Sequence, residues 1–310
     1  MLLITSSFLV ERLTGLTIDA EIVGPDALAD GLDAEIAARV AVVACAGELS
    51  NALIDSLPAL QLVACFSTGY EGIDVAHLRA RGIAMTTGDG VNAHDVSDHA
   101  IALFLALWHR IIGNDALVRS GGWRQGVAPR ASLRGRRAGL VGLGRIGTAI
   151  AERIGALGMH AAWWGPHDKP GIILPRARNL IALAEESDVL FVAARPSAEN
   201  IGQIDGAVIR ALGPDGYLVN VSRGLLVDEA ALERALRAGE IGGAGLDVFA
   251  REPTDPARWS TIPNVVLSPH LAGFTREGGA DLVAQLRANI ERFYQGQPLL
   301  TPLEAAAHQR

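Results

Sequence analysis

Arg223, Asp247, Glu252 and His270 each follow an apolar, strand-like segment in the second half of the chain. They stand in "VNVSRG", "GLDVFAREP" and "LSPHLAG". Open α/β sheets bind their ligands outside the carboxyl ends of the strands, so these side chains are candidates for one site. A guanidinium binds anionic groups, and an imidazole exchanges protons near neutral pH. Taken singly, each residue is more typical of a solvated strand end or a turn, so only their common arrangement predicts chemistry.

A glycine-rich stretch, "AGLVGLGRIGTAIAERIGALGM", carries the G-x-G-x-x-G pattern. Its first glycine permits a tight turn, the second lets the backbone approach a pyrophosphate, and the third lets a helix pack on a strand. The N–H groups at the start of that helix then bind phosphate. A strand precedes the pattern and a helix follows it, which predicts a dinucleotide site. The residues expected to contact the cofactor are Gly142, Gly144, Arg145, Ile146 and Gly147. For Arg145 the alternative is an exposed arginine without a ligand.

The segment "WWGPHDK" stands where NAD-binding chains carry an acidic residue that hydrogen-bonds the adenosine ribose. Here the position holds Gly165, followed by Pro166. Because an acid there repels the 2′-phosphate of NADP, its absence favours NADP(H), with positive charge from His167 and Lys169. Asp168 lies in the same loop and keeps NAD(H) possible. No arginine is expected nearby, so a phosphate would meet only point charges. The alternative is a surface turn that tolerates both cofactors.

The elements that position these residues alternate between short β-rich apolar runs and helical patterns, which predicts parallel βαβ units. The fold class is therefore α/β, with two Rossmann/flavodoxin-like doubly wound parallel-sheet domains and a cleft between them. Residues 1–92 with 278–310 are expected to form a flavodoxin-like substrate-binding domain. Residues 93–277 are expected to form a six-stranded dinucleotide-binding Rossmann domain. A helix over 92–110 is apolar on every face, which predicts burial between domains or subunits.

Composition restricts the class of protein. The chain has 310 residues, 49% of them hydrophobic and 20% charged, which is enough to bury two cores. Its net charge of −7 favours small-molecule partners over nucleic acid or an anionic membrane. The longest apolar run is shorter than the roughly 20 residues of a membrane span, and the first segment is expected to be a strand rather than a signal peptide. Cys45 and Cys65 are expected to be buried free thiols of a cytoplasmic protein, and no ligand spacing predicts a metal site.

The chain resembles the D-isomer-specific 2-hydroxyacid dehydrogenase family over nearly its whole length. The resemblance rests on "FSTGYEGID", "GLVGLGRIG" and the three segments named first, which agree in order, spacing and identity. It implies an NAD(P)-dependent enzyme that transfers hydride to or from a 2-keto or 2-hydroxy acid. It also implies that Arg223 binds the substrate carboxylate, that His270 is the acid/base, and that Glu252 orients the imidazole.

The resemblance assigns further residues around cofactor and substrate. Asp247 matches an aspartate near the nicotinamide carboxamide, and Val96 matches a residue beside the nicotinamide, although ordinary core packing is an equal alternative for Val96. Gly69 would offer its N–H to the substrate carboxylate, and Ser67 and Thr68 would line the pocket. The segment "AARPSAENIG" departs from the family pattern, so its cofactor contacts do not carry over.

The small, polar segment "CFSTGYEG" and the missing acid at Gly165 resemble the NADPH-dependent glyoxylate/hydroxypyruvate reductases of the family. A homodimer through the dinucleotide-binding domain is implied as well. A D-lactate-type or bulkier 2-keto acid dehydrogenase using NAD is the alternative, because about 1–3 kcal/mol of pocket fit decides such preferences. A cofactor-sensing, co-repressor-like binding protein is the remote alternative from a different class.

Overall fold

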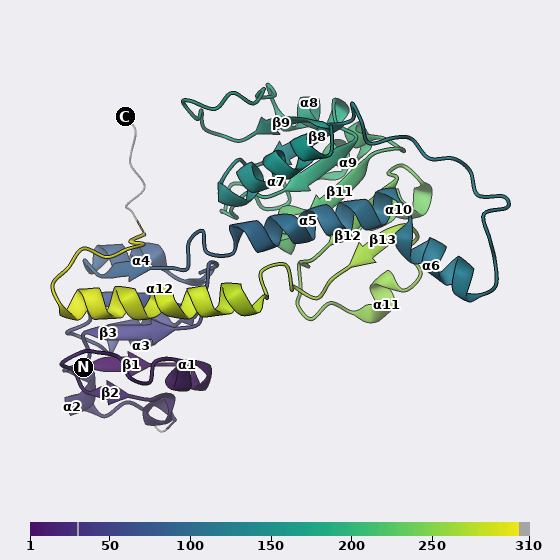
Figure 1. The fold of residues 1–310 in the computed structure, drawn as a ribbon. Helices are drawn as coiled ribbons and strands as arrows, with labels where there is room; N and C mark the ends of the chain where they lie inside the picture. The colour runs from purple at the N-terminus through teal and green to yellow at the C-terminus, as the bar shows by residue number, and fades with distance from the viewer. Residues whose placement is uncertain (30, 304–310) are drawn as a thin grey trace. The chain divides into compact units, whose positions relative to one another are not determined.

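The computed structural model describes residues 1–29 and 31–303, and the chain forms two compact units (Figure 1). The first unit contains residues 1–92 and the segment from Thr275 onward, and the second is Ala93–Phe274. The chain returns to the first unit at Thr275 rather than at residue 278. The reason is that the Thr275 side chain accepts a hydrogen bond from the Gly278 backbone N–H and so caps the last helix, α12 (Arg276–Tyr294).

The first unit is built on a parallel five-stranded sheet with the order β2-β1-β3-β5-β7, which is the flavodoxin-like order. The strands are β1 Leu2–Ile4, β2 Ile22–Val23, β3 Val42–Cys45, β5 Leu62–Cys65 and β7 Ala84–Thr86. Alternate residues of the buried strands point to opposite faces, so helices cover both. One face packs on α1 (Ser7–Arg12) and α12. The other packs on α2 (Ala34–Ala37), α3 (Asn51–Asp55) and α4 (Val75–Ala80). A 3-10 turn η1 (Pro25–Leu28) and the pair β4 (Glu48–Leu49) and β6 (Gly72–Ile73) complete the unit.

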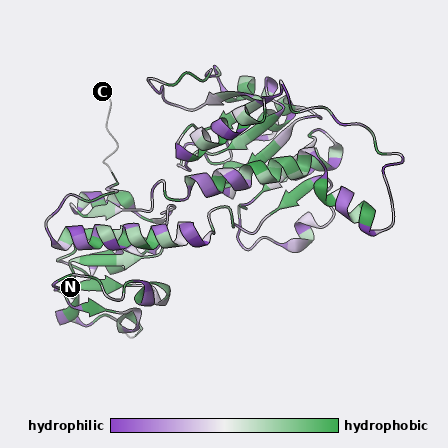
Figure 2. Ribbon diagram, in the orientation of Figure 1, coloured by the Kyte–Doolittle hydropathy of each residue, from purple (hydrophilic) through white to green (hydrophobic). Residues whose placement is uncertain are grey.

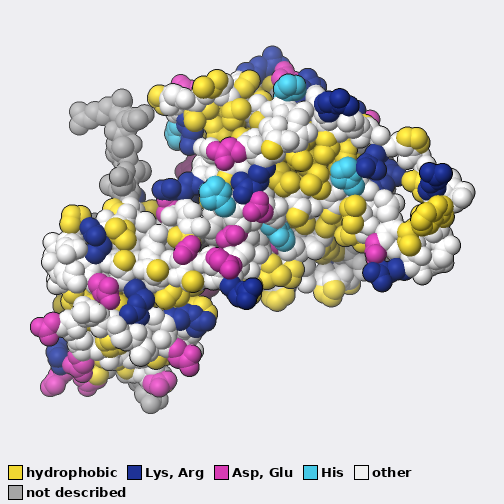
Figure 3. Space-filling model, in the orientation of Figure 1, with side chains coloured by type: hydrophobic (Ala, Val, Ile, Leu, Met, Phe, Trp, Pro, Cys, Tyr) yellow, Lys and Arg dark blue, Asp and Glu magenta, His cyan; other side chains and the backbone are white. Residues whose placement is uncertain are grey.

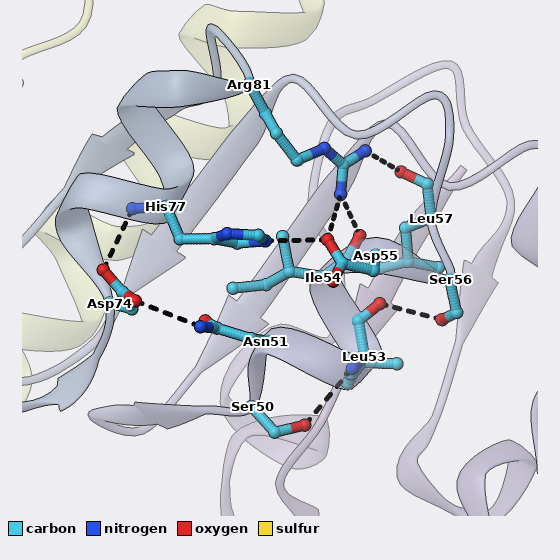
Figure 4. Close-up of polar contacts among 10 residues, drawn as sticks. All are labelled: Ser50, Asn51, Leu53, Ile54, Asp55, Ser56, Leu57, Asp74, His77 and Arg81. Carbon is cyan, nitrogen blue, oxygen red and sulfur yellow. Dashed lines mark hydrogen bonds and ion pairs between the residues drawn. The ribbon is translucent and has the colours of Figure 1, made fainter.

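Helices α3 and α4 are short and are tied together by side chains (Figure 4). Asn51 donates to the Asp74 carboxylate at 3.0 Å, and His77 Nε2 lies 2.7 Å from Asp55 Oδ1. Arg81 donates to two backbone carbonyls at the end of α3 and lies 3.6 Å from Asp55. The Asn51 hydrogen bond, with those from the first turn of α4, lowers the pKa of Asp74. This network holds together the helix that precedes β5 and the helix that follows the loop after β5.

The second unit is built on a parallel six-stranded sheet with the order β13-β12-β11-β10-β8-β9. The strands are β8 Arg137–Val141, β9 His160–Trp164, β10 Val189–Val192, β11 Tyr217–Asn220, β12 Gly243–Leu246 and β13 Val265–Leu267. One face packs on α5 (Ala93–Trp108) and α7 (Arg145–Ala156), the other on α8 (Leu180–Glu185), α9 (Gly206–Leu212) and α10 (Glu229–Ala238). Figure 2 shows the hydrophobic strands between helices with mixed faces. The strand order reverses between β8 and β10, which is the place where such sheets bind ligands. The predicted α/β class with two doubly wound sheets is confirmed.

The crowded helix is α5, which packs against α7 and against strands β11, β12 and β13 inside its own unit. This packing accounts for its buried residues, and burial between domains or subunits stays a prediction. Gly243 and Gly245 allow this approach, since a Cβ on Gly245 would stand 3.0 Å from the Leu103 side chain. Arg110 takes a left-handed φ of 53° and separates α5 from α6 (Ile111–Arg119). Among the described helices none is alone long and apolar enough to cross a membrane; α5 and α6 pass that test only as a pair, bent by 56°.

Candidate active site and cofactor-binding turn

The glycine-rich turn follows β8 and leads into α7. Gly142 has a φ of 90°, and a Cβ there would lie 2.6 Å from Ala194 Cα, so only glycine fits. A Cβ on Gly147 would lie 2.3 Å from the Gly142 carbonyl oxygen, whereas the space at Gly144 is open. Gly144 is the N-cap of the 12-residue α7, and within the described residues no side chain caps this helix start. Open space beside uncapped N–H groups suits a pyrophosphate, so the turn fits a dinucleotide.

The two side chains that follow Gly144 lie differently. Arg145 is the first residue of α7 and is exposed, while Ile146 packs against the core beneath α5 and α7. Val96, on α5, is buried in the same core. The structure thus places Val96 and Ile146 in the packing that supports the turn, and Arg145 on the surface beside it.

The ends of β11, β12 and β13 carry the four residues singled out first, and these strands are neighbours in the sheet. We call Asp247–Glu252, the segment that follows β12, the β12 turn. His270 Nδ1 lies 2.7 Å from Glu252 Oε2, and the other oxygen of Glu252 accepts the Phe249 N–H at 2.9 Å. The His270 side chain is 47% exposed. The imidazole is therefore fixed through Nδ1 and presented at the surface.

Asp247 is buried and braces the segment that contains His270. Its carboxylate accepts the backbone N–H groups of Leu271 and Ala272, both at 2.9 Å, and its carbonyl accepts the N–H of His270 at 2.8 Å. These bonds hold His270 at a left-handed φ of 55°, which costs a non-glycine residue free energy. His99 on α5, to which sequence reasoning gave no role, lies 3.4 Å from Asp247. Asp247 is thus placed to position His270.

Arg223 follows β11 and begins a short turn, η2 (Gly224–Leu226). The buried Asn220 side chain donates to the Arg223 carbonyl at 2.9 Å and accepts from Ser222 at 3.1 Å. A Cβ on Gly224 would stand 1.8 Å from the Phe249 carbonyl carbon, so η2 lies directly against the β12 turn. The structure therefore joins the Arg223 segment to the segment that orients His270.

The buried carboxylate of Glu229 supports the β12 turn. Glu229 on α10 accepts the Ala250 N–H at 2.5 Å and forms an ion pair with Arg258 of α11 (Pro256–Trp259). Arg258 also pairs with Glu233. Sequence reasoning did not single out Glu229, because a glutamate at a helix start is a common N-terminal residue.

The loop after β9 also differs from expectation. We call Gly165–Lys169 the β9 turn. Gly165 is buried, His167 is exposed, and Lys169 Nζ donates to the Leu143 carbonyl of the glycine-rich turn at 2.8 Å. The expectation that no arginine lies here is wrong. Arg176 returns to this turn and donates to the Gly165 carbonyl at 2.7 Å, because residues 175–177 pair with β9.

In the first unit, Ser67, Thr68 and Gly69 form a half-buried turn after β5. Ser67 Oγ donates to the Gly69 carbonyl and lies 3.3 Å from Cys65 Sγ. Cys45 and Cys65 are buried free thiols at paired positions of β3 and β5, as expected. The hydrogen bond from Cys45 lowers the pKa of Cys65 to about 7, and the same bond raises the pKa of Cys45. No group of metal-ligating side chains occurs in residues 1–29 and 31–303.

Comparison with known proteins agrees with this geometry. Residues 101–272 match the model of the D-isomer specific 2-hydroxyacid dehydrogenase NAD-binding domain. The chain is 41% identical to hydroxyphenylpyruvate reductase of Plectranthus scutellarioides and 40% identical to glyoxylate/hydroxypyruvate reductase A of Arabidopsis thaliana, over 81% of this chain and 80% of each relative. The structure of an NADPH-dependent glyoxylate/hydroxypyruvate reductase from Sinorhizobium meliloti, solved with NADP and malonate, is 36% identical. The match covers 97% of this chain and 96% of the chain in that structure, with a TM-score of 0.84. The chain belongs to the D-isomer specific 2-hydroxyacid dehydrogenase family.

Proposed function

We propose that this chain reduces a small 2-keto acid of the glyoxylate or hydroxypyruvate type to the D-2-hydroxy acid, with NADPH favoured over NADH. The observation that carries the proposal is the exposed His270 imidazole held by Glu252 at 2.7 Å, beside the segment of Arg223. Such a group supplies a proton to a carbonyl oxygen that becomes an alkoxide. The names of the relatives support the same chemistry.

In this proposal each residue has one role. Glu252 accepts the Nδ1 proton of His270, which leaves Nε2 to give a proton to the substrate oxygen. The guanidinium of Arg223 binds the substrate carboxylate through its planar fork. Asp247 positions the His270 segment through backbone hydrogen bonds. The bound nicotinamide supplies the hydride.

The turn after β5 in the first unit is proposed to bind the substrate. The backbone N–H of Gly69 would bind the carboxylate, and Ser67 and Thr68 would line the pocket. Their small side chains suit a short, polar acid. The Ser67 hydrogen bond to the Gly69 carbonyl fixes the shape of this turn and so supports a defined binding position.

For the cofactor, the glycine-rich turn would hold the pyrophosphate, and the β9 turn would lie at the adenosine ribose. A glycine in place of an acid at position 165 supports NADPH. The alternative is a D-lactate-type or bulkier 2-keto acid dehydrogenase using NADH. It is favoured by Asp168, an exposed carboxylate in the β9 turn, and by the relative named for hydroxyphenylpyruvate.

The test is steady-state oxidation of NADPH and NADH in parallel with glyoxylate, hydroxypyruvate, pyruvate, phenylpyruvate and 4-hydroxyphenylpyruvate. Highest kcat/KM for NADPH with the two small polar acids is the expected result. Highest kcat/KM for NADH with an aromatic acid would establish the alternative. Absence of turnover with all ten pairs would contradict the proposed reaction.

We also propose a homodimer that forms through the second unit. Every residue of α6 is at least partly exposed, and this helix with the following segment presents Ile111, Ile112, Val118, Trp123 and Val127 to solvent. That segment extends away from the six-stranded sheet, and Figure 3 shows apolar side chains there. A second copy would bury this surface. Sedimentation at micromolar concentration is expected to give a dimer, and Trp123→Glu to give a monomer.

The proposed setting is the cytoplasm, with a small acid and a nicotinamide cofactor as partners. The two free thiols are typical of a reducing compartment. On the face in Figure 3, acidic and basic side chains are interspersed over each unit, which does not favour a polyanionic partner.

A further inference from the structure

Backbone hydrogen bonds to β9 fix the position of Arg176. The Trp163 N–H donates to the Pro175 carbonyl at 2.9 Å, and the Ala177 N–H donates to the Trp163 carbonyl at 2.8 Å. These bonds make residues 175–177 a minimal parallel strand at the outer edge of β9, with Arg176 opposite Trp163. Residues 175–177 therefore occupy, on the outer side of β9, the position that the third strand holds in one half of a Rossmann domain. The pairing with β9 therefore fixes the backbone from which the Arg176 side chain extends.

Its guanidinium lies at the carboxyl end of β9. Nη2 donates to the Gly165 carbonyl at 2.7 Å, and Nη1 forms an ion pair with Asp168. The group also lies over the Trp163 indole, 5.3 Å from the ring centre. The Arg176 side chain is 34% exposed, whereas that of Asp168 is 86% exposed. The arginine is thus held by the sheet, and its acidic partner is almost fully in water.

The end of the second strand is where a dinucleotide domain meets the adenosine ribose, and an arginine nearby accommodates a 2′-phosphate. Lys169 donates to the Leu143 carbonyl, so its ammonium is already bound to the glycine-rich turn. His167 carries a full charge only when protonated. Arg176, by contrast, combines a permanent charge with a planar set of donors.

We propose that Arg176 binds the 2′-phosphate of NADP by exchanging the Asp168 carboxylate for the phosphate. This inference rests on the proposed use of a nicotinamide cofactor. An ion pair with an exposed carboxylate contributes little, whereas a phosphate carries more charge and accepts two parallel hydrogen bonds from arginine. With NADH the Asp168–Arg176 pair stays intact, and the Asp168 carboxylate remains available to the ribose hydroxyls. One pair then accepts both cofactors and favours the phosphorylated one.

The first experiment measures binding of the fragments 2′,5′-ADP and 5′-AMP by calorimetry, so that no turnover is needed. Arg176→Met is expected to weaken 2′,5′-ADP binding by about 10- to 100-fold and to leave 5′-AMP within about twofold, as the loss of a charge-assisted phosphate contact predicts. Arg178→Met removes the same charge from an exposed residue two positions later and is expected to change neither fragment beyond about twofold. Equal weakening of both fragments by Arg176→Met would reveal a structural brace only and would overturn the proposal.

The partner exchange has its own test. Asp168→Asn is expected to strengthen 2′,5′-ADP binding about threefold, because the phosphate no longer competes with a carboxylate for Arg176. The same variant is expected to raise the KM for NADH, because the ribose hydroxyls lose the carboxylate that accepts their hydrogen bonds. Tighter binding of NADH in this variant would contradict the exchange. Turnover with NADH, combined with equal wild-type affinity for the two fragments, would overturn the Arg176 assignment and leave the proposed reaction standing. Tighter binding of 2′,5′-ADP than of 5′-AMP, without turnover of any 2-keto acid, would support the Arg176 assignment and overturn the proposed reaction.

Discussion

The β12 turn and the β9 turn both place a carboxylate after the end of a parallel strand, but the two carboxylates differ in burial and in partner. In the β12 turn, Asp247 is buried and both its oxygens accept backbone N–H groups. In the β9 turn, Asp168 is exposed and its partner is the side chain of Arg176. Buried bonds to backbone fix a geometry, whereas an exposed ion pair can change partners. The difference separates a region suited to the reaction from a region suited to choosing the cofactor.

The largest expected effect is at His270. Replacement by alanine should lower kcat by about 10²- to 10⁴-fold with either cofactor, because the proposed proton donor is lost. Stopped-flow or steady-state measurement at saturating cofactor gives the value. Arg176→Met is the matched contrast and should alter the cofactor preference with kcat nearly unchanged. A His270→Ala enzyme with kcat within threefold of the wild type would end the acid/base assignment.

Asp247→Ala comes next and tests whether the buried carboxylate positions His270. Two backbone N–H groups lose their acceptor, so the free energy of unfolding should fall by about 2–4 kcal/mol and kcat by about 10- to 100-fold. Urea unfolding and kinetics measure the two effects. Asp247→Asn retains one acceptor oxygen and should lose less of both. A rise in cofactor KM alone, with stability unchanged, would instead assign Asp247 to the nicotinamide.

Lys169→Ala probes the link between the β9 turn and the glycine-rich turn. Loss of the bond to the Leu143 carbonyl should raise the KM for NADPH and NADH alike, by about two- to fivefold, with kcat unchanged. A matched substitution, His167→Ala, removes no such bond and should have a smaller effect on NADH. An effect of Lys169→Ala on NADPH alone would make the lysine a direct phosphate ligand.

The smallest effect concerns Tyr294, a half-buried group of the first unit. Burial raises its pKa to about 12, so the protonated phenol stabilises the fold below pH 10 and this contribution is lost as the pH rises from 10 to 12. Tyr294→Phe should therefore remain closer to its neutral-pH stability over that range than the wild type does. Thermal unfolding at pH 8 and pH 10.5 compares the two proteins. An identical alkaline decrease in Tm for both would show that Tyr294 does not contribute.

The two turns also show what can be predicted from sequence. Strand ends and the glycine pattern follow from local periodicity and motif spacing. The Glu252–His270 pair was implied by the family resemblance, and the structure places the two side chains 2.7 Å apart. Arg176 was not predictable, because only the pairing of residues 175–177 with β9 brings it back to Gly165. Helix α6 was not predicted either. The expected helix ends at residue 110, where Arg110 takes a left-handed φ, and Gly113 and Asn114 are weak helix formers in the segment that follows.

Helix α12 has a consequence for the order in which the chain becomes folded during synthesis. Its Leu286 and Ile290 cover the face of the first sheet that contains Leu2, Val42 and Leu62. Those strands leave the ribosome long before the helix does, so the part of this face that α1 does not cover stays exposed while the whole second unit is made. The second unit is continuous in sequence and can complete its core first. The unit that is translated first is therefore the one that finishes folding last.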